Sequence, residues 1–365
     1  MVDTSIAVVG DHFLVGLRPT PYLHDRDRAL LRDLRPAGVI LYKSNFRHDL
    51  PYDGWLESHA RLIEEIRAAT GRDKLFIAID HEGGRVCRTP LPITRFAYAM
   101  RWADHAAEVG AAIGRELATL GMNLNFAPVL DIHTNPQNPV IGERAFGTSA
   151  TAVIAAALPF MAAMQAQGVL ACGKHFPGHG DTSIDSHYGL PSQELGGDHL
   201  RARELRPFAA AIEAGIPMLM TSHILFPHID PDAPVTLSRH FATEILRDEL
   251  GFAGVTVSDD IGMGAMDGFF DAPEAAAQFL AAGGDMLMVC SHFTDSDRAR
   301  TFAAAIRDAI DQGRLDRELL ARSRLRIEAL LARAETNPVH RLSDSVLHAH
   351  AAAAVLFDAQ TDEVV

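Results

Sequence analysis

The sequence predicts one domain of the α/β class, a (β/α)8 barrel of the TIM type, and three observations lead to this fold class. Short runs of β-branched and apolar residues alternate with helical stretches along the 365-residue chain. The interiors of these runs are almost free of charge, as expected for parallel strands that are covered on both faces. The β-then-α order repeats eight times, and eight units is the number that closes a barrel.

The expected strands are short apolar runs, and several of them follow a glycine by only a few residues. Gly38, Gly121 and Gly168 are examples. A glycine after a helix adopts a left-handed cap at little cost, and the short αβ loop that results is common in α/β folds. The runs that we assign to strands are residues 14–17, 38–42, 75–80, 124–130, 169–175, 218–223, 254–258 and 286–290.

The stretches between the strands are rich in Ala, Leu and Arg, which are good helix formers. Each begins after a strand and ends before the next one, so each is a candidate crossover helix. The stretches that we assign to helices are residues 26–34, 55–70, 101–120, 151–167, 200–214, 239–250, 273–282 and 295–333.

The domain organisation follows from this count of units. We expect residues 1–334 to form the barrel and residues 335–365 to form a C-terminal extension that is partly helical. The stretch HAHAAAAVLF in the extension favours one more helix, which packs either on the barrel or on a partner subunit. The sequence leaves that choice and the oligomeric state open.

The composition excludes several classes of protein. Apolar residues make up 48% and charged residues 22%, the usual mix of a globular domain. The formal net charge of −14 argues against a nucleic-acid partner and against adhesion to an anionic membrane surface. A small ligand that is neutral or modestly charged remains compatible.

The N-terminus and the cysteines bear on the compartment. The first residues have no basic region and no long apolar core, so we see no signal peptide. The longest apolar run, residues 152–164, contains Pro159 and is too short to span a bilayer. The three cysteines lack the spacing of a disulfide framework, and Cys172 and Cys290 lie in expected strands. We therefore expect a cytoplasmic protein.

Titratable residues gather at the carboxyl ends of five consecutive expected strands. In barrels of this kind the chemistry lies on the loops that follow those ends. A single Asp there could simply cap a helix, but the joint pattern indicates a functional site. The residues are Asp80, His81, Glu82, Asp131, the segment KHFPGHGDTSIDSH (174–187), Ser222, His223, Ser258, Asp259 and Asp260.

The segment 174–187 is a long loop, because Pro177, Gly178 and Gly180 forbid a helix. Asp185 and His187 are two residues apart, so on an extended backbone both point the same way and the carboxylate can hydrogen-bond the imidazole. Such a contact would favour the protonated imidazole, which is a competent general acid. A purely structural Asp–His contact is the alternative.

Other patterns in this region are weaker. His175 and His179 are four residues apart like a zinc-protease pair, but that geometry needs the helix that Pro177 and Gly178 prevent. A non-helical metal cluster stays open at this point. The run from Gly168 to Lys174 resembles a phosphate-binding loop but lacks the following Ser or Thr.

The segment VTVSDD places Asp259 at the mouth of the expected barrel and Asp260 one residue further on. A carboxylate at the mouth can act as a nucleophile or as a base. Asp260 is the better candidate for capping the segment that follows. We therefore prefer Asp259 for the chemistry.

Taken together, these segments resemble a known family. KHFPGHGDTSIDSH, IDHEGGRVCR, APVLD, IGERAFG, TSHI and GVTVSDDIGM are similar to the motifs of glycoside hydrolase family 3, and more narrowly to its single-domain bacterial β-N-acetylglucosaminidases of peptidoglycan recycling. The similarity runs from about residue 14 to about residue 334 in the motif order of that family. The family fold is the barrel that the periodicity also predicts.

The resemblance implies roles for matching positions. Asp259 corresponds to the nucleophile, His187 to the acid/base and Asp185 to its partner, in a retaining mechanism that releases terminal β-linked N-acetylglucosamine from muropeptides or N-acetylglucosaminyl-1,6-anhydro-muramic acid. It implies no cofactor and no metal. The positions that correspond to residues binding the sugar ring are Asp80, Arg88, Arg144, Lys174 and His175.

The sequence also departs from the family. His81 stands where the family usually has Gln, and the segment TPLPITRF after Arg88 is unlike the usual wording. We expect both near the entrance to the site. Three alternative functions stay open: a phosphorylase in which phosphate replaces water, a non-catalytic sugar-binding barrel, and a metal-dependent hydrolase.

Overall fold

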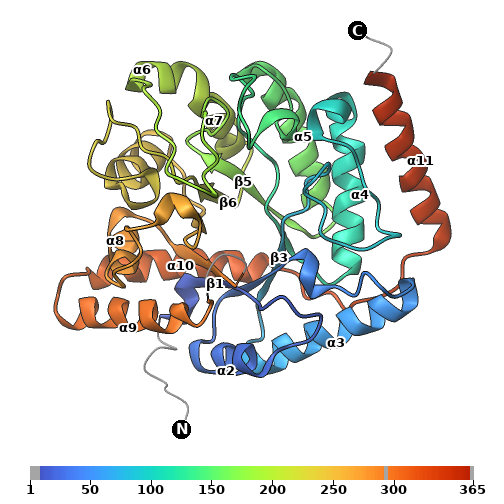
Figure 1. The fold of residues 1–365 in the computed structure, drawn as a ribbon, viewed down its shortest axis with the longest axis horizontal. Coiled ribbons are helices and arrows are strands. Elements are labelled where there is room, and N and C mark those ends of the chain that lie inside the picture. The colour runs from blue at the N-terminus through green and yellow to red at the C-terminus, as the bar shows by residue number, and fades with distance from the viewer. Residues whose placement is uncertain (1–8, 292–294, 362–365) are drawn as a thin grey trace.

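A closed barrel of eight parallel strands forms the centre of the molecule (Figure 1), in the computed structural model, which describes residues 9–291 and 295–361. The strands pair in chain order, and β8 pairs with β1 to close the barrel. The predicted fold class is therefore confirmed. The strands are β1 Phe13–Gly16, β2 Gly38–Leu41, β3 Phe76–Ile79, β4 Leu124–Asn125, β5 Leu170–Phe176, β6 Met218–Thr221, β7 Val255–Asp260 and β8 Met286–Cys290.

Helices surround the barrel and lie between successive strands in the chain. Two of the connecting segments, Leu200–Glu204 and His240–Glu249, are π-helical. The α-helices are α2 Asp25–Leu34, α3 Tyr52–Thr70, α4 Ala106–Thr119, α5 Ala150–Gln165, α6 Gly197–His199, α7 Leu205–Glu213, α8 Ala275–Ala282, α9 Arg298–Asp311, α10 Arg317–Arg333 and α11 Asp344–Thr361.

The strands are apolar because both of their faces are buried. Successive side chains of a strand point to opposite sides, so Leu14 packs inside the barrel while Phe13 and Val15 pack against the helices. Cys172 and Cys290 belong to the inner layer, as expected for cysteines in strands, and neither forms a disulfide.

One end of the barrel is closed by α10. Ile327, Leu330 and Leu331 of this helix join the inner apolar cluster. Ser323 of the same helix lies 3.5 Å from His12, which precedes β1. Since His12 marks the amino ends of the strands, the amino-terminal face is covered and the carboxyl-terminal face is left for a site.

Two expected elements differ from the structure. The fourth strand was expected over residues 124–130, but β4 ends at Asn125, because Pro128 has no N–H to donate to a ladder. The helix expected over residues 295–333 is two helices, α9 and α10. Gly313 adopts a left-handed conformation (φ 70°) between them, and Asp316 caps α10 by accepting from the backbone N–H of Glu318.

The C-terminal extension contributes α11, which lies beside α4 at the edge of the molecule (Figure 1). The Nδ1 of His350 lies 2.8 Å from Glu116 of α4, and the ring of Phe357 stacks on His105 at 4.0 Å. Among the helices of the described residues, none combines the length and the apolar character needed to cross a bilayer.

Candidate active site

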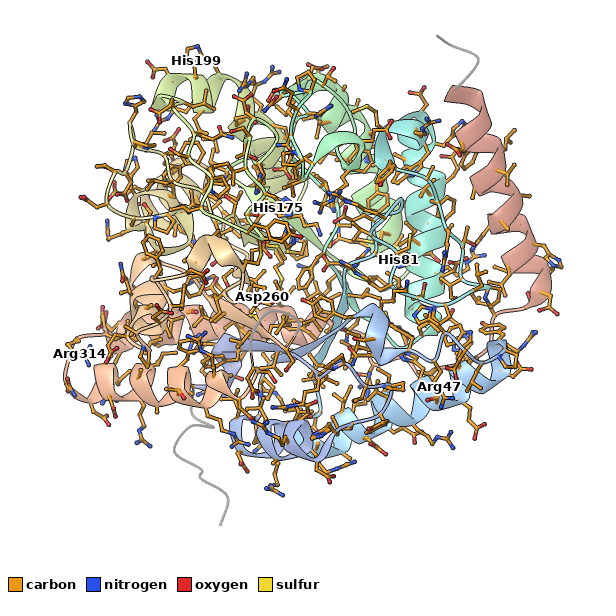
Figure 2. The ribbon with its side chains drawn as sticks, viewed as in Figure 1. Arg47, His81, His175, His199, Asp260 and Arg314 are labelled. Carbon is orange, nitrogen blue, oxygen red and sulfur yellow. The ribbon has the colours of Figure 1, made fainter. Side chains whose placement is uncertain are left out.

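A cavity of about 880 Å³ opens at the carboxyl ends of the strands. Its walls come from the segments after β1, β2, β3 and β4, from the carboxyl ends of β5 and β7 with the loops that follow them, and from side chains of β6 and β8. Figure 2 shows His175 and Asp260 near the middle of the barrel, whereas His199, Arg47 and Arg314 lie at the periphery. All of the site residues predicted from sequence line this cavity: Asp80, Arg88, Arg144, Lys174, His175, Asp185, His187 and Asp259.

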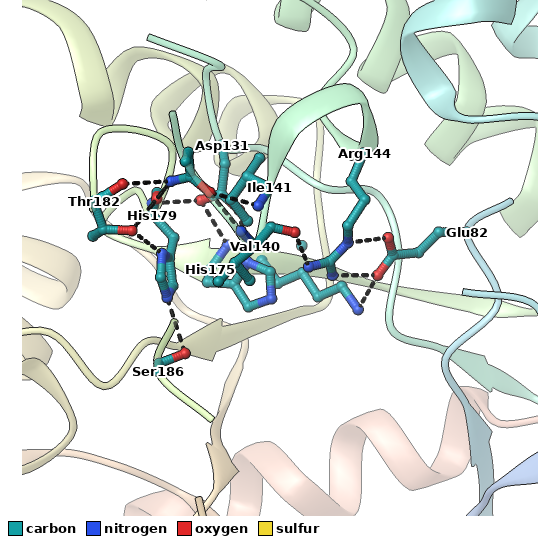
Figure 3. Close-up of polar contacts among 12 residues, drawn as sticks. Glu82, Asp131, Val140, Ile141, Arg144, His175, His179, Thr182 and Ser186 are labelled. Carbon is teal, nitrogen blue, oxygen red and sulfur yellow. Dashed lines mark hydrogen bonds and ion pairs between the residues drawn. The ribbon is translucent and has the colours of Figure 1, made fainter. Parts of the chain in front are cut away.

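Glu82 organises the ionic groups on one wall of the cavity (Figure 3). Its carboxylate forms a bidentate pair with Arg144, with two N–O distances of 2.8 Å, and lies 2.5 Å from the Nζ of Lys174. Lys174 also donates to Asp80 at 2.7 Å. Four charged side chains, from strand β5 and from the segments after β3 and β4, therefore hold one another in fixed positions.

The protonation states in this cluster follow from mutual compensation. Burial alone would raise the pKa of Glu82, but the charges of Arg144 and Lys174 hold that pKa well below its usual range. Burial would lower the pKa of Lys174, but Asp80 and Glu82 raise it above the usual value. Glu82 is thus a carboxylate and Lys174 an ammonium at neutral pH.

Asp131 holds the start of the loop that follows β5 (Figure 3). Its Oδ1 accepts from the backbone N–H groups of His175 (3.1 Å) and His179 (2.7 Å). Its Oδ2 lies 2.6 Å from the Nδ1 of His175, which orients that ring. Burial would raise the pKa of Asp131, but the neighbouring His175 lowers it, so this fully buried residue stays ionised.

The loop then continues towards His187. Inside it, His179 lies 2.7 Å from the Oγ1 of Thr182 and 3.0 Å from the Oγ of Ser186. Burial lowers the pKa of His179 to about 4, so its imidazole is neutral and holds the loop together through these two contacts. The backbone carbonyls of Ser186 and His187 accept from Ala265 (3.0 Å) and Gly264 (3.1 Å) in the loop after β7.

Asp185 and His187 make the contact that the sequence spacing suggests. The Nδ1 of His187 lies 2.6 Å from the Oδ1 of Asp185, which also accepts from the backbone N–H of His187 at 2.9 Å. Burial would raise the pKa of Asp185, but these two bonds lower it below its usual value. The side chain of His187 is 40% exposed, so its ring can meet a ligand.

Asp259 ends β7 on the floor of the same cavity. Burial would raise the pKa of Asp259, but the neighbouring imidazoles of His223 and His175 lower it below the usual value. His223 is buried and is fixed by Thr236 at 2.7 Å and by the backbone carbonyl of Asp260 at 3.1 Å. The carboxylate of Asp259 is therefore ionised and faces the cavity.

Asp260 caps the turn after β7, as the sequence suggested. Its Oδ1 accepts from the backbone N–H groups of Gly262 (3.0 Å) and Cys290 (3.3 Å). Burial raises the pKa of Asp260 to about 7, despite the bond from Gly262 and with the help of the charge on Asp259. Two adjacent aspartates thus have opposite pKa shifts.

The entrance is lined differently from our expectation. Arg88 lies at the wall, with its guanidinium 6.0 Å from the ring centroid of Tyr42. His81 does not line the cavity: it is 1% exposed and lies behind the wall, where its electrostatic neighbours are Glu116, Arg88, Thr94 and Glu82. The expectation that His81 lies near the entrance was therefore wrong, because the alternation along the chain turns Asp80 and Glu82 inward and His81 outward.

Three residues matter here more than the sequence indicated. Glu82, Asp131 and His223 were recognised only as titratable residues at strand ends. Two of their partners are far away in the chain: Glu82 and Arg144 are 62 positions apart, and Asp131 and His175 are 44 positions apart. Their positions after expected strands indicate that they lie near the site. Their pairings with other residues form only when the barrel closes, so the sequence does not reveal them. Within the described part of the chain, no three His, Cys, Asp or Glu side chains are grouped so as to hold a metal ion.

Comparison with known proteins relates the chain to sugar-cleaving enzymes. Residues 15–330 match the model of the glycosyl hydrolase family 3 N-terminal domain. The chain is 37% identical over 322 residues to the beta-hexosaminidase A of Pseudoalteromonas piscicida. The aligned region covers 80% of this chain but only 53% of that protein, so the chain spans about half the length of this relative. It is 34% identical to a beta-hexosaminidase of Methylococcus capsulatus, covering 89% of this chain and 98% of that protein.

Solved structures agree with these relatives. A family 3 beta-N-acetylglucosaminidase from Paenibacillus sp. str. FPU-7 superposes with a TM-score of 0.86 at 32% identity, over 98% of this chain and 69% of the other. NagZ from Neisseria gonorrhoeae superposes with a TM-score of 0.73 at 28% identity, over 96% of this chain and 98% of the other. The two relatives named above are bacterial β-hexosaminidases, and the chain belongs to glycosyl hydrolase family 3.

Proposed function

We propose that the protein is a retaining exo-β-N-acetylglucosaminidase that hydrolyses terminal β-linked N-acetylglucosamine. The observation that carries this proposal is the shared cavity: an imidazole braced by a carboxylate, His187 with Asp185, and an ionised carboxylate, Asp259, line one space. The names of the relatives support the substrate, and NagZ from Neisseria gonorrhoeae was solved with N-trifluoroacetyl-D-glucosamine bound.

The sugar that is released binds against the ionic wall. Glu82 holds Lys174 and Arg144 in place, Lys174 in turn holds Asp80, and all three present charged groups to the cavity. Charge-assisted hydrogen bonds to sugar hydroxyls are stronger than neutral ones. His175, oriented by Asp131, and Arg88 complete the set of side chains that we assign to binding of the N-acetylglucosamine ring.

His187 acts as the acid and then as the base. Because Asp185 fixes the Nδ1 of the ring, the Nε2 is the atom that exchanges a proton with the substrate. It protonates the glycosidic oxygen as the bond to the anomeric carbon breaks, and this assistance is typically worth about 10²- to 10⁴-fold in rate.

Asp259 acts as the nucleophile. Its lowered pKa keeps it ionised, so it attacks the anomeric carbon and forms a glycosyl ester as the leaving group departs. Water then loses a proton to His187 and attacks the same carbon, and Asp259 leaves as a carboxylate. Two displacements on one carbon give a product with retained configuration.

For the natural substrate we propose cytoplasmic peptidoglycan fragments, N-acetylglucosaminyl-1,6-anhydro-muramic acid and its peptides. These fragments are anionic on the leaving-group side. Lys43, Arg85 and Arg88 line the cavity, and the ionic cluster leaves their charges available to such a group.

The mechanism is tested by trapping the glycosyl ester. Incubation with an activated 2-fluoro N-acetylglucosamine analogue should label Asp259, and peptide mass spectrometry would locate the adduct. Asp259→Ala should lose on the order of 10⁴- to 10⁶-fold in kcat on an aryl β-N-acetylglucosaminide, as does loss of a residue that acts within a catalytic unit.

The control for this variant is Asp267→Ala, an exposed position on the same loop that does not line the cavity. That variant should keep wild-type turnover. An adduct on another residue, or normal turnover by folded Asp259→Ala, would contradict the assignment. Assays with and without inorganic phosphate, with the product identified, separate hydrolysis from phosphorolysis.

A further inference from the structure

Tyr188 is a large aromatic side chain that the fold leaves open to solvent beside the cavity. It is 86% exposed, follows His187 directly, and lines the same space. The two rings are tilted by 54° with centroids 6.4 Å apart. An exposed aromatic next to a binding cavity is a common feature of surfaces that contact a ligand.

The backbone under Tyr188 is held on both sides. The N–H groups of Tyr188 and Gly189 donate to the carbonyl of Asp185 at 3.0 and 3.3 Å, which closes a tight turn. Across from it, Gly264 packs so closely that an added Cβ would lie 2.9 Å from the carbonyl carbon of Tyr188. The ring is therefore presented from a defined position.

The chemistry decides what the ring faces. His187 protonates the oxygen that joins the two parts of the substrate, so the leaving group must lie on the His187 side of that bond. The released sugar lies on the other side, against Asp80 and Lys174. Tyr188 lines the cavity beside His187, with the two ring centroids 6.4 Å apart, and this proximity favours the leaving-group side for its ring.

We propose that Tyr188 is a specificity-determining residue whose ring packs on the apolar face of a pyranose in the leaving group. This inference rests on the proposed function and deepens it by naming the leaving-group class. A pyranose presents a face of C–H groups, and its burial against an aromatic ring is favourable through apolar contact.

The test compares two substrates that share the N-acetylglucosaminyl group. N,N′-diacetylchitobiose has a pyranose leaving group, whereas β-N-acetylglucosaminyl fluoride has none. Tyr188→Ala should lower kcat/KM for the disaccharide about 10-fold, mainly through KM, and change that for the fluoride less than twofold. Tyr188→Phe, which keeps the ring, should recover most of the loss.

The control is Tyr22→Ala, because Tyr22 is also an exposed aromatic (60%) but does not line the cavity. It should leave both substrates unaffected. An equal loss on both substrates in Tyr188→Ala would mean that the residue acts on the shared N-acetylglucosaminyl group. A loss in kcat rather than KM, for the disaccharide alone, would mean that it positions His187, because fluoride departs with little acid assistance. No loss on either substrate would remove any role, and all three results overturn the inference. Wild-type protein that cleaves neither substrate would overturn the proposed function as well.

Discussion

Two buried aspartates lie at opposite ends of the barrel and differ in what surrounds them. Asp285, before β8 at the amino-terminal end, accepts from Arg326 and Arg247 at 2.6 Å each and from the backbone N–H of Thr256 at 2.8 Å. Burial would raise its pKa, but the two guanidinium groups lower it. Asp260, at the carboxyl end of β7, has only backbone donors for its Oδ1, and burial raises its pKa to about 7.

This difference shows that a buried carboxylate does not by itself indicate a functional site. Asp285 is fully compensated by its partners, lies away from the cavity, and serves the closure of the barrel. Asp260 lacks a cationic partner and lines the cavity beside Asp259. In barrels of this type the amino-terminal face carries stability and the carboxyl-terminal face carries chemistry.

Glu82 combines the two situations. Like Asp285, it is paired with two cations, Arg144 and Lys174. Unlike the partners of Asp285, these cations line the cavity and can meet a ligand. The same electrostatic arrangement thus becomes a binding surface when it is placed at the open end.

The largest expected effect on stability is that of Asp285→Ala. Two partly buried guanidinium groups would lose their shared, fully buried carboxylate, and breaking a buried pair costs about 3–5 kcal/mol. Urea unfolding measures this cost. The KM of the fraction that remains folded should stay within twofold of wild type, since the site is at the other end.

Asp248→Ala, an exposed position near Arg247, is the control and should change the free energy of unfolding by less than about 0.5 kcal/mol. A large rise in KM in Asp285→Ala would contradict the separation of stability from ligand binding, because it would show that the two ends of the barrel are coupled.

The second expected effect is a pH dependence of opposite sign at the two aspartates. Between pH 3.8 and about 7 the unfolded chain ionises Asp260 while the folded protein keeps it protonated, so this group makes the fold less stable as pH rises. Asp260→Asn removes that loss. Relative to wild type it should gain up to about 4 kcal/mol across this window.

Asp285→Asn should behave in the reverse way. The folded pKa of Asp285 is lowered, so its contribution is fully present above pH 3.8 and is lost as pH falls through the folded pKa. The stability deficit of Asp285→Asn should therefore shrink in acid. Chemical denaturation at a series of pH values measures both variants, and parallel profiles would contradict the assigned pKa shifts.

The smallest effect is expected at a third buried carboxylate, Glu116, which lies under α11. It is 1% exposed and accepts from the backbone N–H and the Oγ1 of Thr94 as well as contacting His350. His350→Ala should cost about 1–2 kcal/mol, because a buried acceptor loses one partner. His348→Ala, at an exposed position of the same helix, should cost almost nothing in the same unfolding assay.

Most of the fold follows from the sequence, because the period of apolar residues encodes it directly. Each expected strand contains or overlaps an observed one. The two errors arose where we extended an apolar pattern across residues that end an element. Gly313 and Asp316 divide the last expected helix into two, and Pro128 shortens β4. These glycine, aspartate and proline residues are visible in the sequence, so both boundaries could have been predicted from it.

The site was predictable in its membership but not in its pairings. Strand-end position identified Asp259 and the loop with Asp185 and His187, and all three line the cavity. The roles of these residues stay predictions. The dependence of Lys174 and Arg144 on Glu82 arises from chain segments that meet only when the barrel closes, so no spacing within one segment could reveal it.

The attachment of the loop after β5 to Asp131 has a consequence for engineering. That carboxylate comes from the segment after β4, yet it accepts from two backbone N–H groups at the end of β5 and in the loop that follows it. A graft of residues 174–187 alone into another barrel would arrive without its anchor. The smallest segment that can be transferred with its contacts intact therefore includes the chain after β4 together with the loop after β5. Recombination between relatives should tolerate crossovers before β4 better than crossovers between β4 and β5.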